Sequence, residues 1–442
     1  MPDNANADGR KHPQGTGRTD VIVIGAGLSG LAAAGHAIRA GAKVRLIAMG
    51  WGQQKVAPGW ISVCDRAEDD VIAEVRGHAV LHPEHPYGLA GADAMLQGLE
   101  QFRALAEEAG LFYDWRQKDG HNMRLMTALG AIQRPAMAPR AMAYGDLTDV
   151  SGPVLLVGFT GWRDFYPEMA VNNLRAQGFE ARALWVTLPG VDQYWDPWPN
   201  ELAQSFDNAA FYEAIARQVQ PHARDAALVG FPAVLGQDNH NDTVQRMAEQ
   251  IGRPVFEIPT LPPSMPGHRL SRRLTHWMLH QRARVQVGHP VVRARVENGR
   301  CLSVEVEALG HINTFYADEF ILATGGLYNG GIKSHDAGRL WEPLFDLPLV
   351  TPPGEDRADW YHERLLFEHG HPIHRDTGVR VNPAMRPLNA AGEPVLENVA
   401  VIGQMLAGFN PLTDGCAEGI ELATAYKAVQ TALQLDTQET TR

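Results

Sequence analysis

The sequence predicts an α/β protein: a doubly wound parallel sheet with an inserted α/β middle domain and a β-meander. Three observations support this fold class. An apolar strand at residues 20–25 runs into a glycine-rich turn and an alanine-rich helix. Two alternating segments flank Asn298-Gly299, a strong signal for a two-residue hairpin. Two late apolar strands, at residues 320–323 and 398–402, each lead into glycine.

Length and charge narrow the class of protein further. The chain has 442 residues and a formal net charge of −12, from 39 Lys and Arg against 51 Asp and Glu. This length predicts two or three domain-sized units. The acidic balance argues against nucleic-acid binding, because no strong positive field is present to displace counterions.

Cysteine spacing and hydropathy exclude several other classes. The three cysteines, Cys64, Cys301 and Cys416, lie far apart and form no CxxC or Cys/His cluster. We therefore expect no disulfide framework, no metal site and no self-contained iron–sulfur cluster. No stretch approaches the ~20 apolar residues of a membrane helix. Residues 1–19 are polar and lack the apolar region of a signal peptide, so we expect a disordered tail on a cytoplasmic protein.

The expected elements fall into two domains, one of them discontinuous. Residues 20–65 and 289–442 form the sheet domain, with a second strand at 43–48, the meander strands 291–297 and 301–307, and a last helix at about 418–433. Residues 66–288 form the inserted domain. Its expected elements are strands at 153–158, 180–188 and 226–231, and helices at 166–177 and 242–251.

The strongest chemical motif is Gly25-x-Gly27-x-x-Gly30, between the first strand and the helix at residues 28–40. Gly25 permits the tight turn, Gly27 lets the backbone approach a pyrophosphate, and Gly30 lets the helix pack on the strand. Free amides at the helix N-terminus then face the phosphates. Because strand, spacing and helix are in register, this pattern predicts a Rossmann-like, FAD- or NAD(P)-binding sheet rather than a turn built for packing alone.

One expected partner of this motif is missing. The second strand of such a sheet normally ends in an Asp or Glu that binds the ribose. Here it ends in Met49-Gly50 without an acid, so the adenosine end of a dinucleotide is less certain than its phosphate end. Arg45 lies inside that strand, and we interpret it as a surface arginine rather than as a ligand for a 2′-phosphate.

The second motif joins the two late strands to glycine. Thr324-Gly325 follows one strand and Gly403 follows the other, and Gly415 precedes the last helix. Glycines at strand ends let the backbone approach a cofactor, and the N-terminus of that helix could place amides against a flavin ring that becomes negative on reduction. A glycine-rich αβ unit without cofactor is the alternative, but together with the first motif the pattern favours a flavoprotein.

The third motif is a proline-rich loop at residues 259–270, which delivers His268 and Arg269 to the start of a helix. A rigid loop with these residues could grip an anionic group, since arginine binds phosphate or carboxylate in a bidentate manner. The alternative is a structural turn beside a solvated basic helix, which we favour for Arg272 and Arg273. Of the other histidines, His82 and His85 are acid/base candidates, although turn residues are the more ordinary interpretation.

Taken together, these motifs resemble the B subunit of anaerobic glycerol-3-phosphate dehydrogenase. The segment Ile-Pro-Thr-Leu-Pro-Pro-Ser-x-x-Gly-x-Arg-Leu at residues 258–270 is the most specific piece, and His85-Pro86-Tyr87 also fits. The resemblance implies a flavoprotein that oxidises sn-glycerol 3-phosphate to dihydroxyacetone phosphate. It also implies two partners, a catalytic flavoprotein subunit and an iron–sulfur subunit that anchors the complex at the membrane and passes electrons to quinone.

Two questions stay open at this stage. The resemblance implies FMN, whereas the glycine fingerprint predicts FAD. The chain could also be a non-catalytic electron-relay or scaffold subunit, or a free-standing FAD-dependent oxidoreductase with another substrate. We assign flavin binding to the discontinuous domain, and substrate, cap or partner binding to the inserted one; no catalytic base is assigned.

Overall fold

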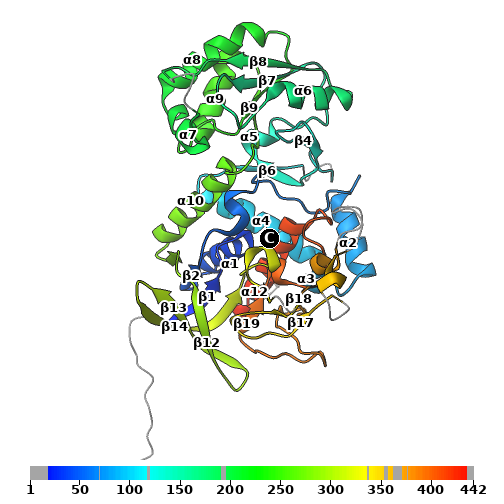
Figure 1. Ribbon diagram of the computed structural model, residues 1–442, viewed down its shortest axis with the longest axis vertical. Helices are drawn as coiled ribbons and strands as arrows, with labels where there is room; N and C mark the ends of the chain where they lie inside the picture. Colours follow the sequence, from blue (N-terminus) through cyan, green and yellow to red (C-terminus); the bar gives the residue numbers. More distant parts are fainter. Residues whose placement is uncertain are drawn as a thin grey trace, which may run out of the picture.

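The computed structural model shows a larger and a smaller α/β unit, joined through α10 (Met265–His280) and the strand region around β6 (Met137–Pro139) (Figure 1). It describes residues 18–68, 70–116, 120–190, 196–335, 338–352, 357–361, 371–375 and 377–435. Most of the predicted N-terminal tail lies outside the described residues. The fold class predicted from the sequence is confirmed.

The larger unit is built on a parallel sheet whose order is β11-β2-β1-β14, with β19 on the other side of β14. The central strand β1 pairs in parallel with both neighbours, so that Val21 lies opposite Val44 and Glu319. Its residues 21–24 are all apolar and buried, as expected for a strand in the middle of a parallel sheet. The strands span Thr19–Ile24 (β1), Val44–Ala48 (β2), Arg284–Val287 (β11), His311–Leu322 (β14) and Val399–Val401 (β19).

Strand β14 belongs to two layers at once. Its second half joins the parallel sheet, while its first half pairs antiparallel with β13 (Arg300–Ala308), which in turn pairs with β12 (Val291–Glu297). The predicted hairpin turn is present, with positive φ of 51° at Asn298 and 73° at Gly299. The meander is therefore confirmed, although the sequence predicted only the last residues of β14.

Helices α1 (Leu28–Arg39) and α12 (Ala417–Ala432) pack on the sheet of the larger unit, and α4 (Ala92–Glu108) packs on these two helices (Figure 1). They pack closely because glycines lie at the crossings. A Cβ on Gly98 would stand 2.5 Å from the carbonyl oxygen of Leu422, and one on Gly35 would stand 2.2 Å from Leu105. Any larger side chain at either position would force the helices apart.

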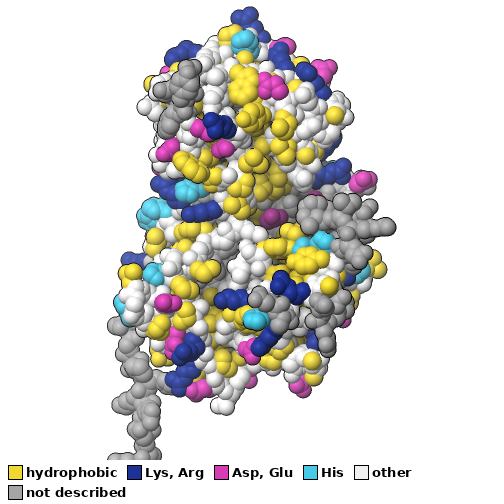
Figure 2. All heavy atoms as spheres, in the orientation of Figure 1, with side chains coloured by type: hydrophobic (Ala, Val, Ile, Leu, Met, Phe, Trp, Pro, Cys, Tyr) yellow, Lys and Arg dark blue, Asp and Glu magenta, His cyan; other side chains and the backbone are white. Residues whose placement is uncertain are grey.

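The smaller unit has a separate parallel sheet in the order β10-β9-β7-β8. Its strands are Val255–Ile258 (β10), Leu228–Pro232 (β9), Val154–Phe159 (β7) and Ala181–Val186 (β8), and its helices are α6 (Pro167–Ala176), α7 (Pro199–Phe206), α8 (Ala209–Val219) and α9 (His240–Ile251). Aromatic rings fill its core, among them Phe159, Phe206 and Phe231. Hydrophobic side chains also gather on one outer face of this unit (Figure 2).

The division between the units differs from the predicted inserted segment 66–288. Strand β11 pairs with β2, and α4 packs into the larger core, although both lie within that segment. The core of the smaller unit is built from residues between Met126 and Met265. We therefore propose that the inserted domain is shorter at both ends, because the chain completes the larger unit before leaving it and after returning.

No helix among the described residues is long and apolar enough to cross a membrane.

Short elements connect these layers. The connecting elements are η1 (Gly52–Lys55), α2 (Val71–Leu81), α3 (Pro86–Ala90), β3 (Tyr113–Trp115), β4 (Leu125–Met126), β5 (Ile132–Gln133), α5 (Arg140–Ala143), η2 (Gln220–His222), η3 (Leu327–Asn329), β15 (Lys333–Ser334), β16 (Leu340–Trp341), β17 (Leu349–Val350), η4 (Arg357–Trp360), α11 (Pro372–Arg375), β18 (Gly378–Val379) and η5 (Gly403–Met405).

Candidate cofactor-binding site

A cleft of about 590 Å³ lies at the carboxyl edge of the larger parallel sheet. Segments far apart in the chain meet there, as expected where strands of an open α/β sheet end. The lining residues come from the ends of β1, β2 and β14, from η1, from the start of the meander and from α12; those used below are Gly25, Gly27, Ser29, Met49, Gly50, Gln53, Pro290, Thr324, Gly325, Asn329, Lys333, Gln404, Glu418 and Glu421.

The N-terminus of α1 is free to bind an anion. Its N-cap is Gly27, no side chain caps the helix, and its first turn carries no acid. The first backbone amides are therefore without an intrahelical partner and carry the positive end of the helix dipole. A Cβ on Gly27 would meet nothing within 4 Å, so the space in front of this residue is open to a ligand.

The other two fingerprint glycines hold this turn together. Gly25 has φ of +121°, and a Cβ there would stand 2.1 Å from the carbonyl oxygen of Ala323. A Cβ on Gly30 would stand 2.1 Å from the carbonyl oxygen of Gly25. The structure thus brings Gly25 and Gly27 to the cleft, with Gly30 packed directly against the turn, which is the arrangement that the predicted roles require.

The end of β14 supplies an unsatisfied hydroxyl. Thr324 and Gly325 line the cleft, and the buried Oγ1 of Thr324 has no hydrogen-bond partner among the described residues. Buried polar atoms are nearly always paired, so a ligand in the cleft would supply the missing partner. With the free amides of α1, this hydroxyl shows that the residues present fit a bound cofactor.

At the far end, the cleft continues past the end of β2 to Met49, Gly50 and Pro290. No carboxylate stands at the end of β2, as the sequence indicated. Arg45 corrects one interpretation, because it is buried rather than at the surface: its guanidinium lies 3.8 Å from the ring centre of Phe315 and donates to Gln286 Oε1 over 2.6 Å. Burial lowers the pKa of Arg45 to about 10.

Two carboxyl groups on α12 line the cleft, and the sequence reasoning did not single them out. Glu421 is buried, and its Oε1 accepts a 2.8 Å hydrogen bond from Gln404. Glu418 stands one turn earlier, is half-buried, and accepts from the backbone amide of Ser62 over 3.3 Å. Burial raises both pKa values, that of Glu421 to about 8. Acids in an otherwise apolar helix just after a glycine-rich loop were the available signal.

Gly403 and Gly415 stand beside the cleft rather than in its lining. Gly403 has φ of +68° and lies under α1, where a Cβ would come within 2.7 Å of Ser29 Oγ. Gly415 has φ of +63°, and a Cβ there would stand 1.8 Å from Asp65 Oδ1. Their cofactor-binding roles stay predictions, with contact through neighbouring residues such as Gln404 as the route that the geometry offers.

The structure separates His268 from Arg269. Arg269 is buried, donates to both carboxylate oxygens of Glu257 over 2.7 and 3.0 Å, and donates to the carbonyl of Gly236 over 2.8 Å. These contacts favour a structural ion pair over the predicted anion binding. Burial acts to raise the pKa of Glu257, but the Arg269 guanidinium and the hydrogen bonds from Arg269 and the amide of Leu235 lower it overall, so this carboxylate stays ionised.

His268 instead lines a groove of about 420 Å³ beside η1, with Lys55, Arg272, Arg273 and His276. Lys, Arg and His side chains gather over α10 (Figure 2). Asp238 partly neutralises this positive charge, because its carboxylate pairs with Arg272. Its backbone carbonyl also accepts a hydrogen bond from Arg273. Burial and the nearby Lys55 lower the pKa of His268.

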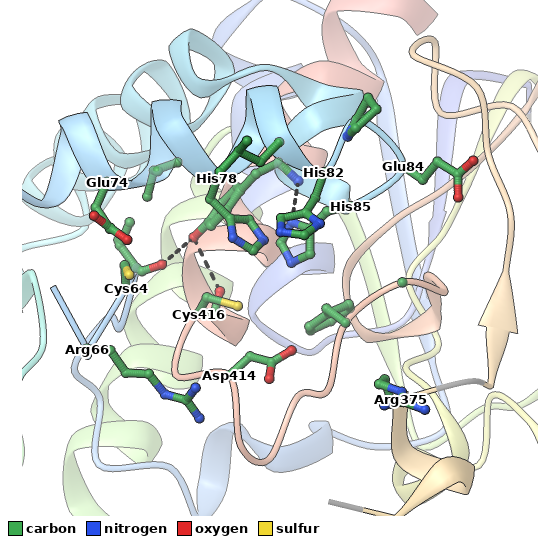
Figure 3. Close-up of a pocket in the computed structure, with 17 residues that line it drawn as sticks. Cys64, Arg66, Glu74, His78, His82, Glu84, His85, Arg375, Asp414 and Cys416 are labelled. Atoms are coloured by element: carbon green, nitrogen blue, oxygen red, sulfur yellow. Dashed lines mark hydrogen bonds between the residues drawn. The ribbon is translucent and has the colours of Figure 1, made fainter. Parts of the chain in front are cut away.

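The predicted acid/base histidines lie in another cavity, of about 760 Å³. Figure 3 shows His78, His82 and His85 together, with Asp414 facing them from the chain before α12. His85 is the N-cap of α3, where its Nδ1 accepts from the amide of Tyr87 over 3.2 Å. Burial lowers its pKa to about 4. Its contacts are those of a turn residue.

The fold and the cleft define an FAD-binding flavoprotein of the oxidoreductase class. Residues 20–420 match the family described as "FAD binding domain". The chain is 32% identical over 424 residues to the probable B subunit of anaerobic glycerol-3-phosphate dehydrogenase from Halobacterium salinarum, covering 93% of this chain and 96% of that protein. It therefore belongs to the family of anaerobic glycerol-3-phosphate dehydrogenase B subunits, and the resemblance found in the sequence is confirmed.

A second relative agrees with this assignment. The B subunit of the enzyme from Vibrio vulnificus is 29% identical over 433 residues, covering 94% of this chain and 96% of that protein. Among solved structures, 3-ketosteroid Δ1-dehydrogenase from Sterolibacterium denitrificans has a TM-score of 0.45 at 12% identity, covering 95% of this chain and 100% of that one. A flavocytochrome c3 fumarate reductase has a TM-score of 0.44 at 11% identity, with coverages of 96% and 80%.

Proposed function

We propose that this chain is a subunit of a quinone-linked glycerol-3-phosphate dehydrogenase. It binds flavin in the cleft and takes part in oxidising sn-glycerol 3-phosphate to dihydroxyacetone phosphate. Membership of the B-subunit family over nearly the whole chain carries this proposal. The open N-terminus of α1 and the unpaired hydroxyl of Thr324, which suit a phosphorylated cofactor, support it.

The chemistry divides between the cofactor and the chain. A bound flavin supplies the hydride acceptor for the alcohol carbon, and the hydroxyl proton leaves to a base. The chain binds the cofactor phosphate at the amides of α1. The catalytic base is left unassigned, because His85 is used as a helix cap and His268 lines another groove.

We propose FAD as the cofactor rather than FMN. The cleft does not end at the α1 N-terminus but continues to Met49, Gly50 and Pro290, where the adenosine half of a dinucleotide lies in this fold. The absence of an acid after β2 removes one ribose contact without closing this space. Release of the cofactor by heat, followed by mass measurement, tests the choice: FMN as the released species would refute it.

For the substrate phosphate we propose the basic groove with Lys55 and His268. Residues of η1 link it to the cofactor cleft, since Gln53 lines the cleft and Lys55 lines the groove. A strongly hydrated lysine and a neighbouring arginine pair suit a phosphate monoester. The predicted role of His268 is thereby kept, whereas that of Arg269 is not.

A specific observation also favours a second candidate, a relay subunit that receives electrons from a catalytic partner. Within the described part of the chain, Lys333 is the one basic residue lining the cleft. Substrate oxidation at this flavin would then require the catalytic partner to complete the phosphate site. For partners we propose a second flavoprotein subunit and an iron–sulfur subunit that carries electrons to the membrane, with this chain on the cytoplasmic side.

An anaerobic titration of the purified holoprotein with sn-glycerol 3-phosphate distinguishes the two candidates. We expect the flavin absorbance near 450 nm to bleach if this chain oxidises the substrate. The enantiomer sn-glycerol 1-phosphate is the control, because it has the same charge but the wrong hand. Bleaching that appears only after the partner subunits are added would support the relay function instead.

A further inference from the structure

The buried carboxyl of Glu421 is the feature of the cleft that the proposed function leaves unexplained. It lies on α12, lines the cofactor cleft and is only 8% exposed. Carboxyl groups are almost never buried to this degree without a cation or a metal ion. No group of side chains suited to a metal ion occurs among the described residues. Among these residues, neither a cation nor a metal ion therefore explains how this carboxyl group is tolerated in a buried position.

Its hydrogen-bond partner is fixed and neutral. Gln404 Nε2 donates to Glu421 Oε1 over 2.8 Å and to Gln53 Oε1 over 3.2 Å. Gln404 Oε1 in turn accepts from Asn329 over 3.2 Å. Because both ends of the Gln404 side chain are bound, its amide orientation is set, and it offers Glu421 a donor that can hold either protonation state without contributing charge.

The surrounding elements do not favour a negative charge either. Glu418 on the same helix acts on Glu421 by repulsion, and a third carboxyl group, the buried Glu342, also lines the cleft. From η5, Gly403 approaches the side chain, since its Cβ position is 3.5 Å from Glu421 Cγ, and the same position lies 2.7 Å from Ser29 on α1. Gly98 of α4 crosses α12 one residue further on. The cleft's basic residue, Lys333, is exposed on β15.

A flavin nucleotide would bring further negative charge into the same cleft. Its phosphate binds at the α1 N-terminus, and Ser29 of that first turn lies against Gly403, beside Glu421. An ionised carboxylate there would repel the phosphate in a low-dielectric site, whereas a protonated carboxyl would be neutral and could donate a hydrogen bond.

We propose that Glu421 couples cofactor binding to protonation: its carboxyl carries a proton when an anionic flavin nucleotide occupies the cleft, and it acts there as a hydrogen-bond donor. The inference rests on the cofactor binding of the proposed function and not on its substrate. Burial, followed by repulsion from Glu418, raises the pKa of Glu421 to about 8, in agreement with a carboxyl that is protonated at neutral pH.

The expected dependence of flavin affinity on pH follows from the raised pKa of Glu421. Below about pH 8 the empty cleft already holds the proton, and the affinity is constant. Above it, the carboxyl must be reprotonated before the cofactor binds, so the affinity falls tenfold per pH unit. Between pH 7 and pH 9 the dissociation constant for FAD is expected to rise about 10-fold, with uptake of close to one proton at pH 9.

The test measures FAD and FMN binding to the apoprotein by quenching of flavin fluorescence from pH 6.5 to 9. Glu421→Gln keeps the shape and one donor but cannot ionise, so its affinity should be constant over this range and equal to that of the unmodified chain at pH 7. Glu249→Gln, an exposed glutamate on α9, is the matched control and should retain the 10-fold dependence.

Calorimetry in buffers of different ionisation enthalpy counts the protons taken up on cofactor binding, by the unmodified chain and by Glu421→Gln. Uptake of close to one proton at pH 9 by the unmodified chain, absent in Glu421→Gln, supports the proposal. Binding that is independent of pH, or an unchanged dependence in Glu421→Gln, would overturn it while leaving the proposed function intact. Failure of the unmodified chain to bind either flavin at any pH would instead overturn the proposed function.

Discussion

Replacing Gly27 by alanine should separate cofactor binding from folding. The backbone of Gly27 has φ of −71° and ψ of −178°, an extended conformation that alanine adopts without strain. The added Cβ would meet no protein atom within 4 Å. Stability of the apoprotein should therefore change by no more than about 1 kcal/mol, because alanine restricts the unfolded chain but is a poorer N-cap residue than glycine.

The same methyl group would enter the space where the phosphate approaches the helix N-terminus. An extra methylene in a tightly packed site typically costs about 1–3 kcal/mol. Since ~1.4 kcal/mol is a factor of ten in affinity, the flavin dissociation constant should rise roughly 5- to 150-fold. Flavin fluorescence quenching measures this constant, and urea unfolding of the apoprotein measures stability.

Gly77→Ala is the matched control, because Gly77 lies on exposed α2 and its Cβ would also meet nothing within 4 Å. That variant should bind flavin like the unmodified chain and be about 0.5–1 kcal/mol more stable, as alanine is in a helix. An unchanged flavin affinity in Gly27→Ala would refute the assignment of this turn to the phosphate. A large loss of apoprotein stability would show that the space in front of Gly27 is not open.

Three further substitutions test the packing around the site by urea unfolding. Asn398→Ala leaves three backbone groups of β13 and β14 without their side-chain partner, and should cost about 2–4 kcal/mol; a loss below about 0.5 kcal/mol would contradict this. Arg269→Ala leaves the Glu257 charge buried alone and should cost about 3–5 kcal/mol, whereas unchanged stability with weaker anion binding would restore the predicted anion role. Burial lowers the pKa of His36 to about 4, so the unfolded chain takes up this proton first and stability falls as pH drops from about 6.5 toward 4. The expected loss from this group between pH 7 and 5 is about 1–2 kcal/mol, and His36→Gln should flatten the pH profile; an equally steep profile would count against it.

Local patterns sufficed for much of the fold. The first strand and helix, the Asn298-Gly299 hairpin and the α/β units of the middle segment all appear within one or two residues of their predicted bounds. These elements depend on periodicity and turn chemistry, which a short window of sequence contains. Strand β11 was not predicted, because its half-exposed Arg-Val-Gln-Val segment becomes a strand only by pairing with β2 across more than two hundred residues.

The residues of the candidate site also fall into those that a local motif reveals and those that only the tertiary structure reveals. Gly25, Gly27 and Thr324 could be found because each belongs to a local motif at a strand end. The ion pair of Arg269 could not be predicted, since its partner Glu257 lies on a different element and only the tertiary structure brings them together. Glu421 could not be identified for the opposite reason: a glutamate in a helix ordinarily faces water, and its place in a largely apolar helix after a glycine-rich loop is too weak a signal to predict its burial.

The shared strand β14 also dictates an order of events during synthesis. Val21 in β1 pairs with Val44 in β2 on one side but with Glu319 in β14 on the other, so the second edge of this strand has to wait for nearly three hundred further residues. At about 5–20 residues per second, this delay lasts roughly 15–60 s. The smaller unit, whose sheet and core come from one continuous stretch, can close during this interval. On the ribosome, the inserted unit would thus be the first to complete its sheet, and the edge of β1 that faces β14 would need protection from aggregation until that strand emerges.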